Sequence, residues 1–265
     1  MTTALRPLST GELLDRTFSL YRSHFMLFVG IFALPHLCVL AFQFLTIGSQ
    51  TPITIILYAW GTIFLNLLVS AASQAATVVA VSQVHLDRPA GVWDSFAKVK
   101  GKILGVIGLS MWSGFLIGLA CLALIVPGIL LAIRWSLAVP AKVLENRGVR
   151  DAMARSSALT GGNRGRIFVI WLLFFALAFG VVMLLQWPIQ LAAGVTASVN
   201  VKGSLRHAGE IWQVLSLVAT FVSQCLVGSL ATIAFSLVYY DERVRKEAFD
   251  LQLMMTTLDA PALQA

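Results

Sequence analysis

The residue types that most often perform chemistry in proteins are sparse in this chain and lie far apart in the sequence. The four histidines and three cysteines are His24, His36, His85, His207, Cys38, Cys121 and Cys225. They form no HExxH motif and no zinc-type spacing, and the chain has no GxSxG elbow and no phosphate-binding loop. Each cysteine lies within an apolar run, and we interpret all three as small apolar side chains that fill the core. We therefore expect no catalytic residues, no metal site and no cofactor.

Arg134 is the charged residue that stands out, because it lies inside an apolar run. Seven residues after Pro127, it would lie roughly 10 Å into a membrane from the outer side on an ideal helix. Such a charge costs about 2.5 to 3.5 kcal/mol to insert. Two interpretations stay open. Arg134 binds a phosphate or carboxylate of a lipid or substrate, or it bonds helix carbonyls, the amides of Asn66, Gln74 or Gln224, or the outer headgroups.

Uncharged amides are the other polar groups within or beside apolar runs, and they are Gln43, Asn66, Gln74, Gln83, Gln186, Gln190 and Gln224. Amides commonly bond between membrane helices, so interhelical hydrogen bonding is favoured over a transport path. Gly114 and Gly118 form a GxxxG pair, which permits close helix packing within the chain or between two copies. His36 is the single histidine, aspartate or glutamate of the apolar runs, and we interpret it as a packed side chain.

The elements that must position these residues are long apolar helices. Of 265 residues, 58% are hydrophobic and 12% are charged, whereas soluble domains carry about 25% charged residues. A membrane span needs about 20 apolar residues. About six stretches meet or approach that length, which predicts an all-α polytopic transmembrane bundle in a single membrane domain, 1–265. The stretches are 25–47, 53–84, 103–126, 129–144, 167–187 and 211–240.

Turn residues separate two neighbouring stretches, and others mark where helices begin or end. Val126-Pro127-Gly128 is a helix-stopping sequence, so we expect 103–126 and 129–144 to form a tight antiparallel hairpin. The pair Gly161-Gly162 follows Ala158-Leu159-Thr160 as the end of a helix would. Ser9 and Glu12 match a capping box and predict a helix start.

Basic residues indicate the orientation, since short loops rich in Lys and Arg remain in the cytoplasm. Of 19 Lys and Arg residues, 16 fall before the first span, in 88–102, in 142–166 or in 243–246. The uncharged loops 48–52 and 126–128 are then external, and both termini are cytoplasmic. Four amphipathic segments, 9–23, 90–101, 147–161 and 241–255, are predicted to lie on the cytoplasmic surface as interfacial helices.

The net charge of +7 is interpreted through these same segments. The cations flank apolar runs, so the expected partners are anionic lipid headgroups, with other membrane proteins or a second copy as further candidates. No nucleic-acid-binding pattern is present. Besides Arg134, the candidate anion or lipid contacts are Arg16, Arg22, Lys98, Lys100, Lys102, Arg164, Arg166, Arg243 and Arg245.

The chain resembles the membrane domain of bacterial glycerophosphoryl diester phosphodiesterases. The resemblance is carried by residues 8–22 (LSTGELLDRTFSLYR), 126–129 (VPGI) with Arg134, Val139-Pro140, and 239–251 (YYDERVRKEAFDL). It implies a membrane domain that sometimes precedes a soluble phosphodiesterase domain and very often occurs alone. Ten residues follow Met255, which leaves no room for a catalytic barrel, so no phosphodiesterase activity is expected here.

Two functional hypotheses result. The first is a non-enzymatic, multi-pass protein of the bacterial inner membrane that interacts with anionic lipids or partner membrane proteins. The second is a permease or export accessory for a small molecule, peptide or lipid, with Arg134 and the amides lining the route. An intramembrane lipid-modifying enzyme is disfavoured because no pair of nucleophile and base can be nominated.

Overall fold

A computed structural model describes residues 8–45, 47, 51–86, 88–198 and 206–247. Within these ranges the regular structure is helical throughout, with no β-strand. The helices are α1 Thr10–Ser23, α2 Phe25–Phe44, α3 Pro52–His85, α4 Val92–Val99, α5 Ile103–Ala123, α6 Ile125–Trp135, α7 Ala138–Glu145, α8 Val149–Thr160, α9 Arg164–Ser198, α10 Arg206–Ser223 and α11 Ser229–Glu247, with the π-helix η1 Gln224–Gly228 joining the last two.

The predicted number of membrane-capable helices is confirmed. Six are long and apolar enough to cross a bilayer: Phe25–Phe44, Pro52–His85, Ile103–Ala123, Ile125–Glu145, Arg164–Thr196 and Gly209–Glu247. Their outward residues, such as Trp60 on α3 and Leu184 on α9, are large, apolar and exposed. Exposed apolar surface on this scale requires hydrocarbon as the surrounding medium. The chain is a multi-pass membrane protein.

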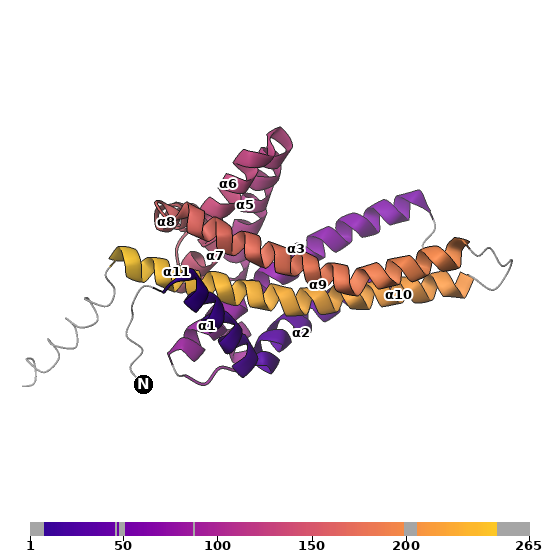
Figure 1. The fold of residues 1–265 in the computed structure, drawn as a ribbon, viewed down its shortest axis with the longest axis horizontal. Helices are drawn as coiled ribbons and strands as arrows, with labels where there is room; N and C mark the ends of the chain where they lie inside the picture. The colour runs from indigo at the N-terminus through magenta and orange to yellow at the C-terminus, as the bar shows by residue number, and fades with distance from the viewer. Residues whose placement is uncertain (1–7, 46, 48–50, 87, 199–205, 248–265) are drawn as a thin grey trace, which may run out of the picture.

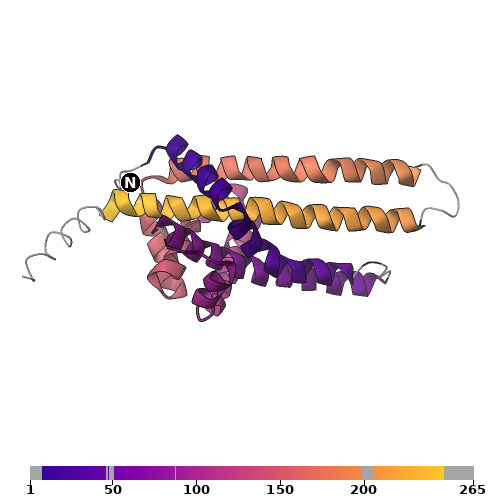
Figure 2. The same cartoon turned by 90° about the horizontal axis from the view of Figure 1, so that it is seen from below.

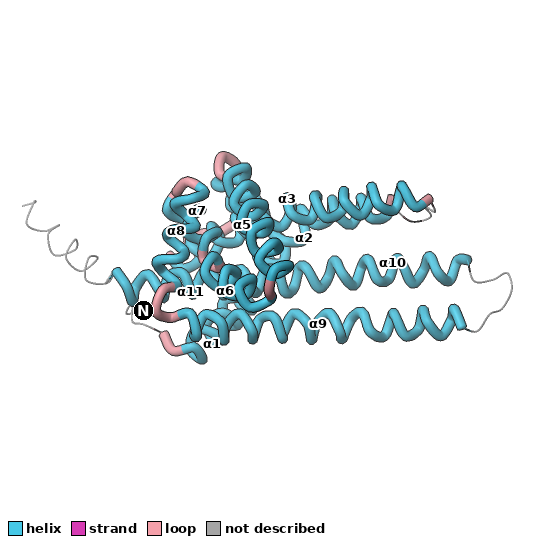
Figure 3. The backbone as a smooth tube through the Cα atoms, turned by 90° about the horizontal axis from the view of Figure 1, so that it is seen from above, coloured by secondary structure: helices cyan, strands magenta, loops and turns pink. Residues whose placement is uncertain are grey.

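Most of the long helices extend toward the same side and thereby define two ends of the molecule. In Figure 1, α9 runs beside the rod formed by α10, η1 and α11. Figure 3 shows α2, α3, α9 and α10 extending to the same side. The opposite end holds α1, α8 and the last turns of α11, as Figure 2 also shows. We call it the basic end, because the predicted basic segments 9–23, 147–161 and 241–247 meet there.

Helix α1 begins as the sequence predicts. The Ser9 hydroxyl accepts from the Glu12 backbone N–H at 3.2 Å, and the Glu12 carboxylate accepts from the Ser9 backbone N–H at 2.8 Å. One face of α1, however, packs into the protein and does not lie on the membrane surface. Leu13 and Thr17 are fully buried, and the helix packs against α11. The apolar side predicted to face lipid therefore faces the protein at Leu13.

The hairpin between α5 and α6 is present, but it turns earlier than predicted. The helix breaks at Leu124, which is extended (φ −161°, ψ 135°), whereas Pro127 and Gly128 lie in the first turn of α6. A first-turn backbone N–H has no partner within its helix, so proline is tolerated there. Gly128 allows the two helices to meet, since an added Cβ would lie 2.1 Å from Sγ of Cys121 and 2.9 Å from its backbone nitrogen.

The direction of this hairpin also differs from the prediction. Figure 1 shows α5 and α6 projecting from the body at a steep angle to α9, so that their connecting turn points sideways. It therefore does not lie with the ends of α9 and α10, where an external loop was predicted. With 11 residues, α6 is about 16 Å long, which is short of the roughly 30 Å hydrocarbon core.

Three other predicted bounds change. The stretch 129–144 is divided at Ser136 and Leu137, so that α7 forms a second helix. The fifth helix runs over Arg164–Ser198 and passes through Pro188, rather than ending at Trp187. Residues 241–247, predicted as part of a separate surface segment, continue α11 and contain two buried carboxylates. Residues 248–255 of that segment lie outside the described part of the chain.

The main apolar core lies toward the basic end. It joins α1, α2, α3, α6, α7, α8, α9 and α11 through fully buried residues that include Leu13, Phe28, Leu137, Ile170 and Tyr239. Gly162 adopts φ +90° directly after α8, a conformation that glycine adopts without strain. The predicted helix end at Gly161-Gly162 is thereby confirmed, and it turns the chain from α8 into α9.

Candidate functional site

Asp241 is the centre of an ion-pair network at the basic end. Its side chain is 1% exposed and accepts from the backbone N–H of Leu8 at 2.6 Å and from Nε of Arg245 at 2.9 Å. Nη1 of Arg166 on α9 pairs with the same carboxylate. Arg166 and Arg245 also donate to the carbonyl of Leu8. The network thus fixes the segment before α1 between α9 and α11.

Glu242 extends this network to the start of α9 through Arg166, and Glu145 is the centre of a second cluster that joins α7, α8 and α11. Glu242, fully buried, accepts from Nδ2 of Asn163 at 2.8 Å. Glu145 at the end of α7 accepts from the Tyr239 hydroxyl at 2.6 Å and from Nε of Arg155 at 2.9 Å. Burial alone would lower the pKa of Arg155, but its hydrogen bonds to Glu145 and Glu247 outweigh this and raise the pKa. Buried charges that are paired in this way hold helices in one arrangement.

The predicted lipid contacts separate into two groups. Arg166, Arg243 and Arg245 form ion pairs with Asp241, Glu242 or Glu247. Nζ of Lys102 donates to the carbonyl of Val143 at 2.9 Å, and Nη2 of Arg16 lies 3.4 Å from Nδ1 of His85. Those five cations already have contacts within the protein. Arg22, Lys100 and Arg164 are exposed. Lys98 is exposed as well, and its Nζ donates to the side-chain amide oxygen of Gln83 at 2.6 Å.

Arg134 lies beside α8. Its Nε donates to the Ser157 hydroxyl at 2.8 Å, and its backbone carbonyl accepts from the Ser156 hydroxyl at 2.8 Å. That same hydroxyl accepts from the Leu137 backbone N–H at 3.2 Å, which satisfies the backbone at the break between α6 and α7. Arg134 therefore bonds α8 and not the amides of Asn66, Gln74 or Gln224. The sequence did not indicate the helix break after Trp135, which places Arg134 at the end of α6 beside α8.

Gly114 and Gly118 make no close helix contact within the described chain. An added Cβ at either position would meet nothing within 4 Å. Glycines that do permit close approach include Gly128, against Cys121, and Gly228, where a Cβ would lie 2.5 Å from the Phe32 ring. The Gly228 contact brings α2 against η1.

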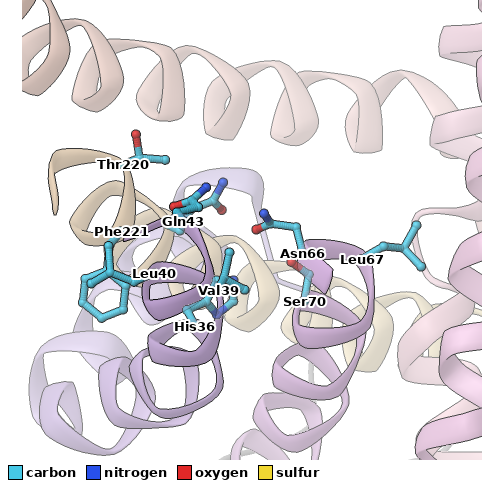
Figure 4. A pocket seen from close by; sticks show the side chains of 10 residues that line it. His36, Val39, Leu40, Gln43, Asn66, Leu67, Ser70, Thr220 and Phe221 are labelled. Atoms are coloured by element: carbon cyan, nitrogen blue, oxygen red, sulfur yellow. The ribbon is translucent and has the colours of Figure 1, made fainter. Parts of the chain in front are cut away.

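A polar cleft of about 350 Å³ lies between α2, α3 and the junction of α10 with η1. We call it the amide cleft. Figure 4 shows its side chains converging from these three sides. Its polar lining residues are His36, Gln43, Asn66, Ser70, Thr220 and Gln224, and its apolar ones are Val39, Leu40, Leu67 and Phe221.

His36 is the buried group of the amide cleft. It is 3% exposed, stacks on Phe32, and its Nδ1 lies 2.8 Å from the Phe32 carbonyl. A carbonyl only accepts, so Nδ1 carries the proton and Nε2 of the neutral ring is an acceptor. Nε2 is buried and has no partner among the described residues. A buried acceptor without a donor is costly to maintain.

Gln224 connects the amide cleft with two neighbouring cavities. One, of about 310 Å³, extends to Gln74, Ser136 and Trp171. The other, of about 240 Å³, extends along α9 and α10 to Gln186. Arg134 lines none of these three cavities. Of the amides predicted to bond between helices, Gln43, Asn66, Gln74 and Gln224 line these cavities. Gln186 lines one of them and also bonds across helices, to Ser216 and Thr220.

The π-helix η1 is a feature that sequence reasoning missed. Its i→i+5 bonds widen the turn that starts at Gln224, and such turns are frequent at functional sites. The carbonyl of Leu226 in this turn accepts from the Tyr21 hydroxyl at 3.3 Å. Burial raises the pKa of Tyr21, which keeps the hydroxyl protonated as a donor. The polar span residue Gln224 was visible in the sequence, but no residue pattern specifies a π-turn.

Comparison with known proteins is informative at the level of the family. No curated protein and no solved structure matches the chain significantly. A family model described as the membrane domain of glycerophosphoryl diester phosphodiesterase matches residues 103–257, which is more than half of the chain. The matched region runs from α5 to beyond α11 and contains Arg134, Tyr239 and the ion-pair network. The chain belongs to the family of glycerophosphoryl diester phosphodiesterase membrane domains.

Proposed function

We propose that this protein is a non-enzymatic, multi-pass protein of the bacterial inner membrane whose exposed cations bind anionic lipid headgroups on the cytoplasmic side. The match to the membrane domain, without the catalytic domain, is consistent with a role other than hydrolysis. The exposed cations support the lipid proposal, because Arg22, Lys98, Lys100 and Arg164 carry their charge at the surface, where phosphate can reach it.

The observation that carries the proposal is the surface of α4 and the start of α5. Trp93 is 71% exposed and Leu104 is 84% exposed, and exposed Lys98 and Lys100 lie between them in the sequence. Tryptophan favours the headgroup level of a bilayer, lysine favours its anionic phosphates, and leucine favours its acyl chains. The three residue types together are typical of an interfacial anchor.

The opposite face of α4 holds this anchor in place. Ser95 and Val99 are fully buried, and the Ser95 hydroxyl donates to the Gly91 carbonyl at 2.7 Å. The helix packs on α3 and α2. The lysines are thus presented from a helix whose position is fixed by the core.

The test measures lipid retention after neutralising the two exposed lysines. A Lys98→Gln, Lys100→Gln variant should retain less phosphatidylglycerol than the wild type in mixed phosphatidylglycerol and phosphatidylethanolamine nanodiscs, read by native mass spectrometry. Each cation near an anionic surface contributes about 1 kcal/mol, so the loss should be at least fivefold.

Lys98→Arg, Lys100→Arg is the matched control. It keeps both charges and should retain the lipid. Equal retention of phosphatidylglycerol by the Gln variant and the wild type would overturn the proposal. Lys102 is left unchanged because its contact with Val143 connects α5 to α7.

A further inference from the structure

The amide cleft combines a buried, unpartnered acceptor with hydrogen-bonding side chains at the depth of the membrane-capable helices. Its residues come from the second half of α2, the middle of α3 and residues 220–224 of the last long helix. Packing alone gives no reason to bury an acceptor such as Nε2 of His36 without a donor. An apolar side chain of the same size would fill the space without that cost.

Charge restricts what the cleft can recognise. No Asp, Glu, Lys or Arg lines the amide cleft or its two neighbours. Phosphates and carboxylates are normally held by arginine, lysine or helix N-termini, so the cleft offers them little. Amides and hydroxyls both donate and accept, and His36 offers an acceptor. A ligand rich in hydroxyl groups complements all of these groups, because each hydroxyl also donates and accepts.

The size and apolar walls agree with this chemistry. A volume of about 350 Å³ is within the range of small-molecule sites. Leu40, Leu67 and Phe221 supply apolar surface beside the polar groups, as needed for the carbon faces of a sugar. We propose that the amide cleft binds an uncharged, hydroxyl-rich group of the sugar type, with a hydroxyl donating to Nε2 of His36. This site is separate from the proposed lipid contacts, and sugar binding goes beyond the proposed lipid-binding function.

Two kinds of molecule carry such a hydroxyl-rich group: a free sugar, and a glycolipid with a sugar headgroup. Binding is measured by native mass spectrometry in phosphatidylcholine nanodiscs containing monoglucosyl diacylglycerol, and separately with millimolar glucose in solution. Binding of either probe at the cleft supports the proposal and identifies the source. Binding of neither probe overturns it, as does a cleft that takes up phosphatidylglycerol but neither sugar.

Variants place the bound probe in the cleft. Gln43→Leu with Asn66→Leu removes two amides and should weaken binding of the sugar probe about tenfold, since two hydrogen bonds are lost. Gln190→Leu is the matched control, because Gln190 is an exposed amide on α9 that lines none of the three cavities. Equal binding by the double variant and the control would overturn the assignment.

His36→Phe separates ligand binding from a structural role. Phenylalanine keeps the ring stacked on Phe32 and removes the unpartnered acceptor, so the empty protein should melt at the same or a higher temperature. The rise in melting temperature on adding the sugar probe should disappear. A lower melting temperature with an unchanged ligand-induced rise would contradict the proposal. Lys98 and Lys100 lie outside the cleft, so failure of either proposal leaves the other to be judged separately.

Discussion

At the scale of single residues, Asp241 and Glu242 determine how the basic end is assembled. They are adjacent in sequence and both buried, but they bind different partners, Asp241 facing Leu8 and Arg245 and Glu242 facing Asn163. Arg166 reaches both. Loss of one partner of a buried ion pair leaves the other charge uncompensated, which destabilises more than the pair itself contributes.

We expect Asp241→Asn to lower the free energy of unfolding by about 3 kcal/mol. The amide cannot neutralise Arg166 and Arg245, and it competes poorly for the Leu8 backbone N–H. Thermal unfolding in detergent micelles measures the effect. Asp15→Asn, at an exposed carboxylate of α1, is the control and should change stability by less than about 0.5 kcal/mol. Equal melting temperatures for the two variants would contradict a stabilising role of the network.

The sequence revealed the cations of this network but not their pairing. Arg166 and Arg245 stood out because they flank apolar runs, and on that ground they were predicted to contact lipid. Their carboxylate partner Asp241 is 75 residues from Arg166, and only the fold brings the two together. Likewise, Arg134 was correctly singled out as unusual, but its partner Ser157 depends on how short α6 is.

At the scale of elements, the α5–α6 hairpin shows what residue patterns specify and what they leave open. The apolar lengths and the Val126-Pro127-Gly128 sequence correctly predicted a tight return. The break is instead at Leu124 because proline and glycine fit the first turn of the returning helix. The break between α6 and α7 is accompanied by contacts with α8, and the π-helix η1 by contacts with α2. No local residue pattern indicates such contacts.

Gly128 should be the sensitive glycine of this hairpin. A Cβ at Gly128 would overlap Sγ of Cys121 and crowd its backbone, so Gly128→Ala must separate the helices and should destabilise the protein by about 1 to 3 kcal/mol. Gly118→Ala places its Cβ in open space and should be neutral or slightly stabilising, since alanine favours helix. Melting temperatures of the two variants provide the comparison. Greater damage from Gly118→Ala would indicate that Gly118 packs against a second copy of the chain.

At the scale of the whole molecule, the distribution of charge and the arrangement of the helices both distinguish two ends. The predicted basic segments 9–23, 147–161 and 241–247 meet at one end, although the sequence assigned them from charge alone. The number of apolar helices was predictable from hydropathy because the bilayer imposes a minimum length. The crosswise direction of α5 and α6 was not, because hydropathy reports length and carries no information on tilt.

Orientation in the membrane can be checked with reporter fusions. With the basic end in the cytoplasm, periplasm-active reporters should be active when inserted after Gly48 or near Val201. They should be inactive after Ala90, Arg150 or Ala265, because lysine- and arginine-rich loops are retained. Alkaline phosphatase activity, normalised to the amount of fusion protein, is the measurement. The opposite pattern of activity would reverse the topology and with it the cytoplasmic placement of Lys98 and Lys100.

The sideways hairpin has a consequence for the bilayer itself. Its apolar residues include the exposed Leu122 and Leu124, and Figure 1 shows the hairpin projecting from the half of the molecule nearer the basic end. With the long helices upright in a bilayer, the hairpin would take up acyl-chain space mainly in one leaflet. A protein with that footprint would expand one leaflet relative to the other, a stress that is relieved when the membrane curves convexly toward the expanded side.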